Sequence, residues 1–131
     1  MGPFAHTFSV VVTIHYALGV VVVVINLVAG LWGIAVWKGW LTPGRVFAQV
    51  LAASQTVIIG QAVLGLLLLS QNLRAAQQLH YVYGLLPAGL VIFAYSARRN
   101  DQRRNILIFA IAALVASALA VRAFMSSGVL G

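Results

Sequence analysis

The chain has 131 residues, of which 63 % are hydrophobic and only nine are formally charged, namely eight Lys or Arg and the single acid Asp101. Soluble domains carry about 25 % charged and about 45–50 % apolar residues, so this composition argues against a soluble protein. It also excludes disorder, which needs low hydrophobicity and a high density of charge. The chain contains no Cys, which excludes thiol redox chemistry, disulfides and thiolate metal sites.

Four apolar segments follow one another along the chain, separated by short polar connections. A helix that crosses a bilayer needs roughly 20 mainly apolar residues, and windows almost free of charge predict spans at about 8–37, 46–70, 76–97 and 105–126. Apolar residues run all the way round each segment, unlike the one-sided pattern of soluble amphipathic helices. We therefore predict one all-α domain over residues 1–131, an integral membrane four-helix bundle surrounded by the lipid bilayer.

The basic residues are distributed unevenly between the connections. The first and third connections carry Lys38, Arg45, Arg98, Arg99, Arg103 and Arg104. The second connection carries only Arg74, and Arg122 lies near the end of the fourth segment. The positive-inside rule then places loops one and three in the cytoplasm and both termini outside, and we expect a prokaryotic plasma membrane. Topology, together with attraction to anionic lipid head groups, accounts for the net charge of +7 without a nucleic-acid partner.

A short pattern occurs in both the first and the third segment. The sequence from His15 to Gly19 is HYALG, and that from His80 to Gly84 is HYVYG, so H-Y-x-x-G appears twice with a separation of 65 residues. The two segments run in the same direction across the membrane. The repeat therefore predicts two parallel helical hairpins, each with a histidine near the outer end of its first helix.

One stripe of each odd-numbered helix gathers its histidine together with small and polar residues. At helical spacing the stripes are His15, Gly19, Val22, Asn26, Gly30 and Gly33 in the first helix, and His80, Gly84, Pro87, Val91 and Tyr95 in the third. Small residues let membrane helices approach closely, and intramembrane polar residues face the bundle interior. We expect the two histidines to face each other. Counting from the cytoplasmic ends leaves a depth mismatch of about 7 Å, which tilt or extension of the first helix would absorb.

Two facing imidazoles in an apolar bundle suit a metal held in a planar macrocycle, and haem takes one axial nitrogen from each side. In each repeat a glycine follows four residues after the histidine, and we expect Gly19 and Gly84 to let the macrocycle approach the backbone. Zinc fits less well, because it needs three or four protein ligands. Copper bound by His6, His15 and His80 is an alternative, although an interfacial location without ligand duty suits His6 better.

Further polar residues near or within the spans also need partners. Arg74 and Arg122 lie on the same side as the histidines, and both are candidate partners for haem propionates. For Arg122, snorkelling to the outer interface is an equally good interpretation. Within the second segment, Gln49, Gln55 and Gln61 are interpreted as interhelical hydrogen-bonding residues rather than as a substrate path.

The segments around the two histidines resemble one half of haem A synthase. The resemblance rests on HYALG at His15, on QVLAASQTVIIGQAVLGLLLL from Gln49 to Leu69, and on LHYVYGLLPAGLVIFA from Leu79 to Ala94. Each half of that family is a four-helix bundle with a histidine on each of two parallel helices. The resemblance covers most of this chain and half of the larger enzyme, and it implies ligation of haem by His15 and His80.

This chain also departs from the haem A synthase pattern. The family's catalytic half has an acidic residue shortly before the first histidine, whereas Val10, Val11, Val12 and Thr13 stand here, and Tyr16 replaces the Arg that often follows that histidine. The cysteines of many members are absent. Oxidation of a haem substituent is therefore not expected.

We favour a b-type cytochrome-like protein that transfers electrons or carries haem, as a homodimer or within a larger membrane redox complex. One alternative is a cofactor-free accessory subunit of a respiratory or photosynthetic complex. Another is a small four-helix transporter, although such transporters generally use a membrane carboxylate, which this chain lacks. Catalysis ranks below these three functions because the chain shows no recognisable nucleophile–base pair.

Overall fold

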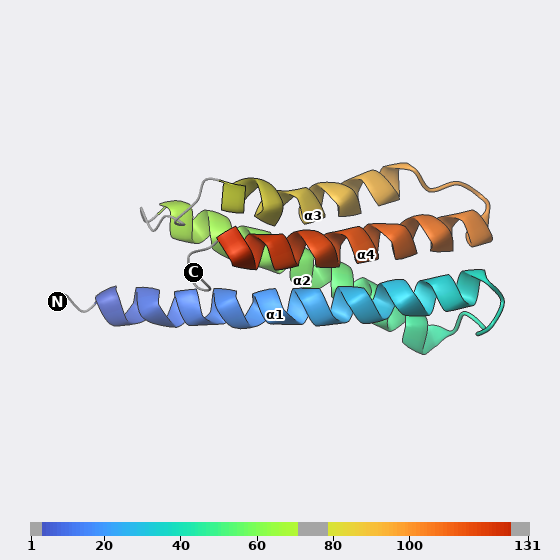
Figure 1. Ribbon diagram of the computed structural model, residues 1–131, viewed down its shortest axis with the longest axis horizontal. Helices are drawn as coiled ribbons and strands as arrows, with labels where there is room; N and C mark the ends of the chain where they lie inside the picture. The colour runs from blue at the N-terminus through green and yellow to red at the C-terminus, as the bar shows by residue number, and fades with distance from the viewer. Residues whose placement is uncertain (1–3, 71–78, 127–131) are drawn as a thin grey trace.

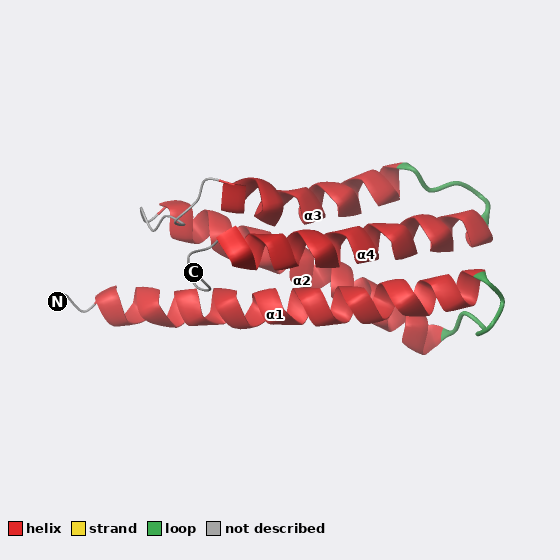
Figure 2. Cartoon of the chain, viewed as in Figure 1, coloured by secondary structure: helices red, strands yellow, loops and turns green. Residues whose placement is uncertain are grey.

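Within its described residues, the computed structural model of the chain contains four helices (Figure 1). They are α1 (Phe4–Trp37), α2 (Arg45–Ser70), α3 (Leu79–Ser96) and α4 (Gln102–Ser126). The structure describes residues 4–70 and 79–126, and every regular element in these two ranges is a helix (Figure 2). The all-α prediction is confirmed, and the four predicted spans agree with the helices to within a few residues at each end.

Local sequence signals explain where α1 ends and where α4 begins. Gly39 follows α1 with a φ of 82°, a conformation that glycine adopts without strain. The amide of Gly39 donates to the carbonyl of Val36 (3.0 Å) and that of Trp40 to Ala35 (2.9 Å), which is a Schellman C-cap. At the start of α4, the carboxylate of Asp101 accepts a hydrogen bond from the backbone amide of Arg104 at 3.1 Å, as an N-cap residue does.

The helices are apolar enough to suit a lipid environment. Three stretches are long and apolar enough to cross a membrane by length and composition, namely Val10–Trp37, Arg45–Ser70 and Gln102–Met125. The 18 residues of α3 extend about 27 Å at about 1.5 Å per residue, which is close to the roughly 30 Å hydrocarbon core of a bilayer. Large hydrophobic side chains are exposed on the outer faces of all four helices, among them Leu31, Val63, Phe93 and Ile111.

Successive helices alternate in direction, so α1 and α3 run one way while α2 and α4 run the other (Figure 1). α4 packs against both α1 and α3, whereas α2 packs against α1 and much less extensively against α3. α1 and α3 therefore lie on a diagonal of the bundle. Each half of the chain forms one helical hairpin, as the repeat predicted.

Helices α1 and α4 approach each other closely near the two described loops. A Cβ atom added at Gly30 would lie 2.5 Å from Cγ of Leu114, and one added at Gly33 would lie 2.7 Å from Cβ of Ala110. The face of α4 that is buried consists of small residues, namely Ala110, Ala113, Ala116, Ser117 and Ala120. The prediction that the small-residue stripe of α1 permits close helix packing is confirmed.

Buried polar side chains in the middle of the bundle are hydrogen-bonded. Nδ2 of Asn26, which is 1 % exposed, donates to the carbonyl oxygens of Val22 (2.9 Å) and Ser54 (3.3 Å). The hydroxyl of Ser117 donates to the carbonyl oxygen of Val23 at 2.8 Å. These bonds link α1 to α2 and α4, and they confirm that Asn26 faces the bundle interior.

Candidate functional site

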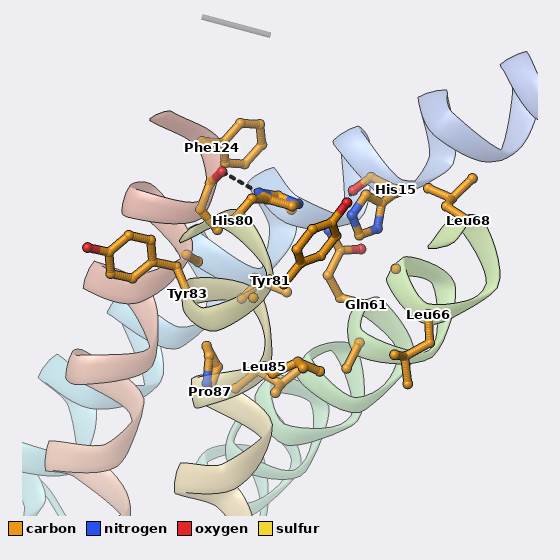
Figure 3. Close-up of a pocket in the computed structure, with 18 of the residues that line it drawn as sticks. His15, Gln61, Leu66, Leu68, His80, Tyr81, Tyr83, Leu85, Pro87 and Phe124 are labelled. Atoms are coloured by element: carbon orange, nitrogen blue, oxygen red, sulfur yellow. Dashed lines mark hydrogen bonds between the residues drawn. The ribbon is translucent and has the colours of Figure 1, made fainter. Parts of the chain in front are cut away.

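A cavity of about 250 Å³ lies between the four helices, near the starts of α1 and α3 (Figure 3). Apolar side chains and glycines form most of its wall, and the polar lining residues are His15, Tyr16, Gln61, His80, Tyr81 and Tyr83. The cavity thus contains both predicted histidines. Side chains from α2 also line the cavity, and the sequence did not predict them as site residues.

His15 on α1 and His80 on α3 lie next to each other across this cavity (Figure 3). Their ring centroids are 6.3 Å apart, and their ring planes are inclined at 82°. The structure therefore brings the two residues of the repeat together. The expected depth mismatch does not separate them, because α1 extends beyond the end of α3 at the opposite end of the bundle (Figure 1).

A main-chain hydrogen bond orients the ring of His80. Its Nδ1 lies 2.7 Å from the carbonyl oxygen of Ala123 on α4. A carbonyl oxygen only accepts hydrogen bonds, so Nδ1 carries the proton in the neutral ring and Nε2 carries a lone pair. Histidines that bind metals commonly donate their other ring N–H to a backbone carbonyl in this way. His80 is thus held by α4 with Nε2 available to a ligand.

The surroundings of His15 come mainly from α2. Nε2 of Gln61 donates to the backbone carbonyl of His15 at 2.7 Å, which confirms the predicted interhelical role of Gln61. A Cβ atom added at Gly65 would lie 3.4 Å from Cε1 of His15, so this glycine leaves room beside the ring. Sequence reasoning missed Gly65, and the only available signal was its position four residues after Gln61 on the same helix face.

The two repeat glycines have different surroundings. A Cβ atom added at Gly84 would meet no atom within 4 Å, and Gly84 lines the cavity. At Gly19, by contrast, an added Cβ would lie 2.8 Å from the ring of Phe124 and 3.2 Å from Nε2 of Gln61. Gly19 also lines the cavity. Gly84 therefore borders open space, whereas the ring of Phe124 from α4 packs against Gly19 at the cavity wall.

Of the basic residues proposed as anion partners, Arg122 is within the described part of the chain. It is exposed, and its guanidinium carbon lies 5.6 Å from the centroid of the Tyr83 ring. Arg122 does not line the cavity, whereas Tyr83 does, so the cation lies behind one wall residue. Arg74 and the side chain of His6 lie outside the described residues.

Gln55 is another of the residues in the second segment that were predicted to form interhelical hydrogen bonds. Gln55 accepts a hydrogen bond from the hydroxyl of Tyr95 on α3 at 2.7 Å, which confirms its interhelical role. Gln55 does not line the cavity with the histidines. Among the described residues, three or more His, Cys, Asp or Glu side chains nowhere come together. Two imidazoles are thus the metal-binding side chains that the described cavity offers.

Comparison with known proteins gives no match to a family model, to a curated protein or to a solved structure. The resemblance to haem A synthase therefore stays a prediction that depends on the three quoted segments.

Proposed function

We propose that this chain is an integral membrane protein that binds haem, with His15 and His80 as the axial ligands. The observation that carries the proposal is the 6.3 Å separation of the two ring centroids. Two imidazoles on opposite sides of one metal ion have ring centres about 6 Å apart when each metal–nitrogen bond is about 2.0–2.1 Å. A metal with only two protein ligands also suits a macrocycle that supplies the remaining donors.

The size and lining of the cavity are compatible with a flat apolar ligand. Its volume of about 250 Å³ is just below the range of typical ligand cavities, which span about 300–1,000 Å³. Two of its lining residues, Leu66 on α2 and Leu85 on α3, are 52 % and 45 % exposed, and these two helices pack least extensively of the neighbouring helix pairs. The cavity is therefore open between α2 and α3 to a ligand larger than the enclosed space.

Bound haem supplies reversible one-electron transfer. His15 and His80 would hold it from two helices within the apolar cavity wall, and Arg122, behind Tyr83, would offer a cation to a propionate. We infer an electron-transfer or haem-carrying subunit, as a homodimer or within a membrane redox complex. In this proposal the loops after α1 and α3 face the cytoplasm, because they contain most of the basic residues.

Optical spectra of the purified protein, oxidised and reduced, test the haem proposal. We expect a low-spin Soret and α-band spectrum with stoichiometric haem, and loss of that spectrum in His15→Ala and in His80→Ala. Added imidazole should restore it in either variant, because a free ligand replaces a missing side chain but does not repair a misfolded bundle. Tyr16→Phe, next to His15 and also in the cavity wall, is the matched control. Colourless wild-type protein after expression with ample haem would overturn the proposal and favour a cofactor-free accessory subunit.

The proposed membrane topology has its own test, since the chain contains no Cys. Gly44→Cys and Asn100→Cys place single thiols in the loops after α1 and α3. A thiol reagent that does not cross membranes should leave both unlabelled in intact cells and label both after lysis. Labelling of either loop from outside would contradict the proposed orientation.

A further inference from the structure

One hydrogen bond joins Gln61 on α2 to His15 on α1, and each of these residues also has a buried polar atom that this bond does not use (Figure 3). Its Nε2 donates to the backbone carbonyl of His15 at 2.7 Å. Nδ1 of His15 and Oε1 of Gln61 are both buried, and neither has a hydrogen-bond partner among the described residues. Two residues already joined by one bond therefore each present an unpaired polar atom.

The chemistry of these groups allows only one pairing. The carbonyl of His15 accepts and never donates, so the amide nitrogen of Gln61 faces it and Oε1 is left as the free acceptor. Oε1 pairs with the ring only if Nδ1 of His15 carries a proton. In the neutral ring, Nε2 then keeps its lone pair. Pairing the two buried atoms removes the cost of leaving them unsatisfied.

We infer that Gln61 is a positioning residue for His15: its Oε1 accepts a hydrogen bond from Nδ1–H and presents Nε2 to a metal. The consequences for haem rest on the proposed function, whereas the hydrogen bond itself does not. His80 is oriented by the same principle, through the main-chain carbonyl of Ala123. The two ligands are thus inequivalent, since one is held by the backbone of α4 and the other by a replaceable side chain of α2.

A test that needs no haem is the tautomer of each histidine in the apo-protein, measured by ¹⁵N NMR of the imidazole nitrogens. In the wild type we expect His15 to be protonated at Nδ1, and in Gln61→Leu we expect this preference to be lost while the signals of His80 stay unchanged. Protonation of His15 at Nε2 in the wild type, or an unchanged tautomer in Gln61→Leu, would overturn the inference.

The second test measures haem affinity and reduction potential. Loss of a partner that orients a metal-binding histidine typically weakens binding by about 10–100-fold, and we expect this for Gln61→Leu. The potential should become more positive, because a less basic imidazole stabilises the ferric iron less. Gln55→Leu is the matched control. Gln55 lies on α2, as Gln61 does, and the hydrogen bond that it forms with Tyr95 on α3 is outside the cavity.

The outcomes separate the two proposals. If Gln61→Leu and Gln55→Leu lower thermal stability alike and leave the potential unchanged, Gln61 only ties α1 to α2. If the wild type binds no haem, the proposed function fails, and the NMR result still decides the role of Gln61.

Discussion

The two ends of the bundle use the same kinds of residue to opposite effect. Near the described loops, glycines of α1 bring helices into contact, and a Cβ atom at Gly30 or Gly33 would collide with α4. Near the start of α3, Gly84 borders open space, and its added Cβ would meet nothing within 4 Å. We call the first region the packed half, centred on Asn26 to Gly33, and the second the cavity half, centred on His15 and His80.

The two halves also differ in the hydrogen bonding of their buried polar atoms. In the packed half, the side chains of Asn26 and Ser117 donate hydrogen bonds to backbone carbonyls. In the cavity half, Nδ1 of His15 and Oε1 of Gln61 are buried without a hydrogen-bond partner among the described residues. Unsatisfied buried groups are uncommon in native structures and often belong to functional sites. The packed half is thus held by complete hydrogen bonds, and the cavity half, where we propose that a ligand binds, is not.

The largest expected effect comes from filling the cavity. Gly84→Leu places a side chain in the open space, and we expect haem binding to weaken by roughly tenfold or more, the equivalent of about 1–3 kcal/mol of overpacking. Thermal stability should not fall. Gly89→Leu is the control, because its Cβ also meets nothing within 4 Å and Gly89 does not line the cavity. Titration of haem into detergent-solubilised protein measures the effect, and equal affinities for the two variants would contradict the assignment of the cavity.

The converse change acts on the packed half. Gly30→Ala should destabilise the bundle by about 1–3 kcal/mol, because the new methyl group would lie 2.5 Å from Cγ of Leu114 and 3.1 Å from the backbone oxygen of Ala110. Gly60→Ala on α2 meets nothing within 4 Å and should be neutral or stabilising by up to about 1 kcal/mol, as expected from helix propensity. Unfolding by SDS in mixed micelles compares the two. The contrast between the halves would lose its basis if Gly30→Ala were as stable as Gly60→Ala.

A smaller effect is expected at the edge of the cavity half. Arg122→Gln removes the cation above Tyr83 and should weaken haem binding by about twofold to fivefold, as for an exposed ion pair of up to about 1 kcal/mol. The difference from wild type should shrink as salt is added. Arg99→Gln, in the loop at the other end of the bundle, should leave the dissociation constant unchanged. A salt-independent effect would instead indicate that Arg122 acts through packing on Tyr83.

The smallest effect belongs to the polar bonds of the packed half. Ser117→Ala removes the hydrogen bond from α4 to Val23 of α1, and we expect a loss of about 0.6 kcal/mol, the average for such bonds between membrane helices. Ser96→Ala, whose hydroxyl donates within α3 to Ile92, should change stability by less. The same unfolding assay compares the stability of the two variants. A larger loss of stability in Ser96→Ala would show that hydrogen bonds within a helix stabilise this bundle more than hydrogen bonds between helices.

The sequence predicted the helices and the faces of α1 well. Uninterrupted apolar windows between basic connections set the four segments, and helical spacing placed Gly19, Val22, Asn26, Gly30 and Gly33 on one buried face. The repeat also pointed to the pair of histidines that the structure brings together. These features depend on composition and on a fixed period of 3.6 residues, which a sequence displays directly.

The neighbours of each side chain were not predictable in the same way. Gly19 lines the cavity, but its contact with the ring of Phe124 could not be predicted from helical spacing, because it depends on how α4 packs along α1. Gln61 and Gly65 became site residues only through their position against His15. Helical periodicity indicates which residues share a face but not which helix covers that face.

By itself, then, the sequence determined an all-helical, strongly apolar chain with four segments and two histidines in matching positions. The tertiary structure decided that α4 fills the space beside α1 while α2 and α3 separate enough to leave a cavity. The physical reason is that packing depends on the combined shapes of side chains from different helices. The small residues of α4 pack closely along α1 in the packed half. The rings of His15, His80 and Phe124 occupy the cavity half, where the space between the helices is not completely filled.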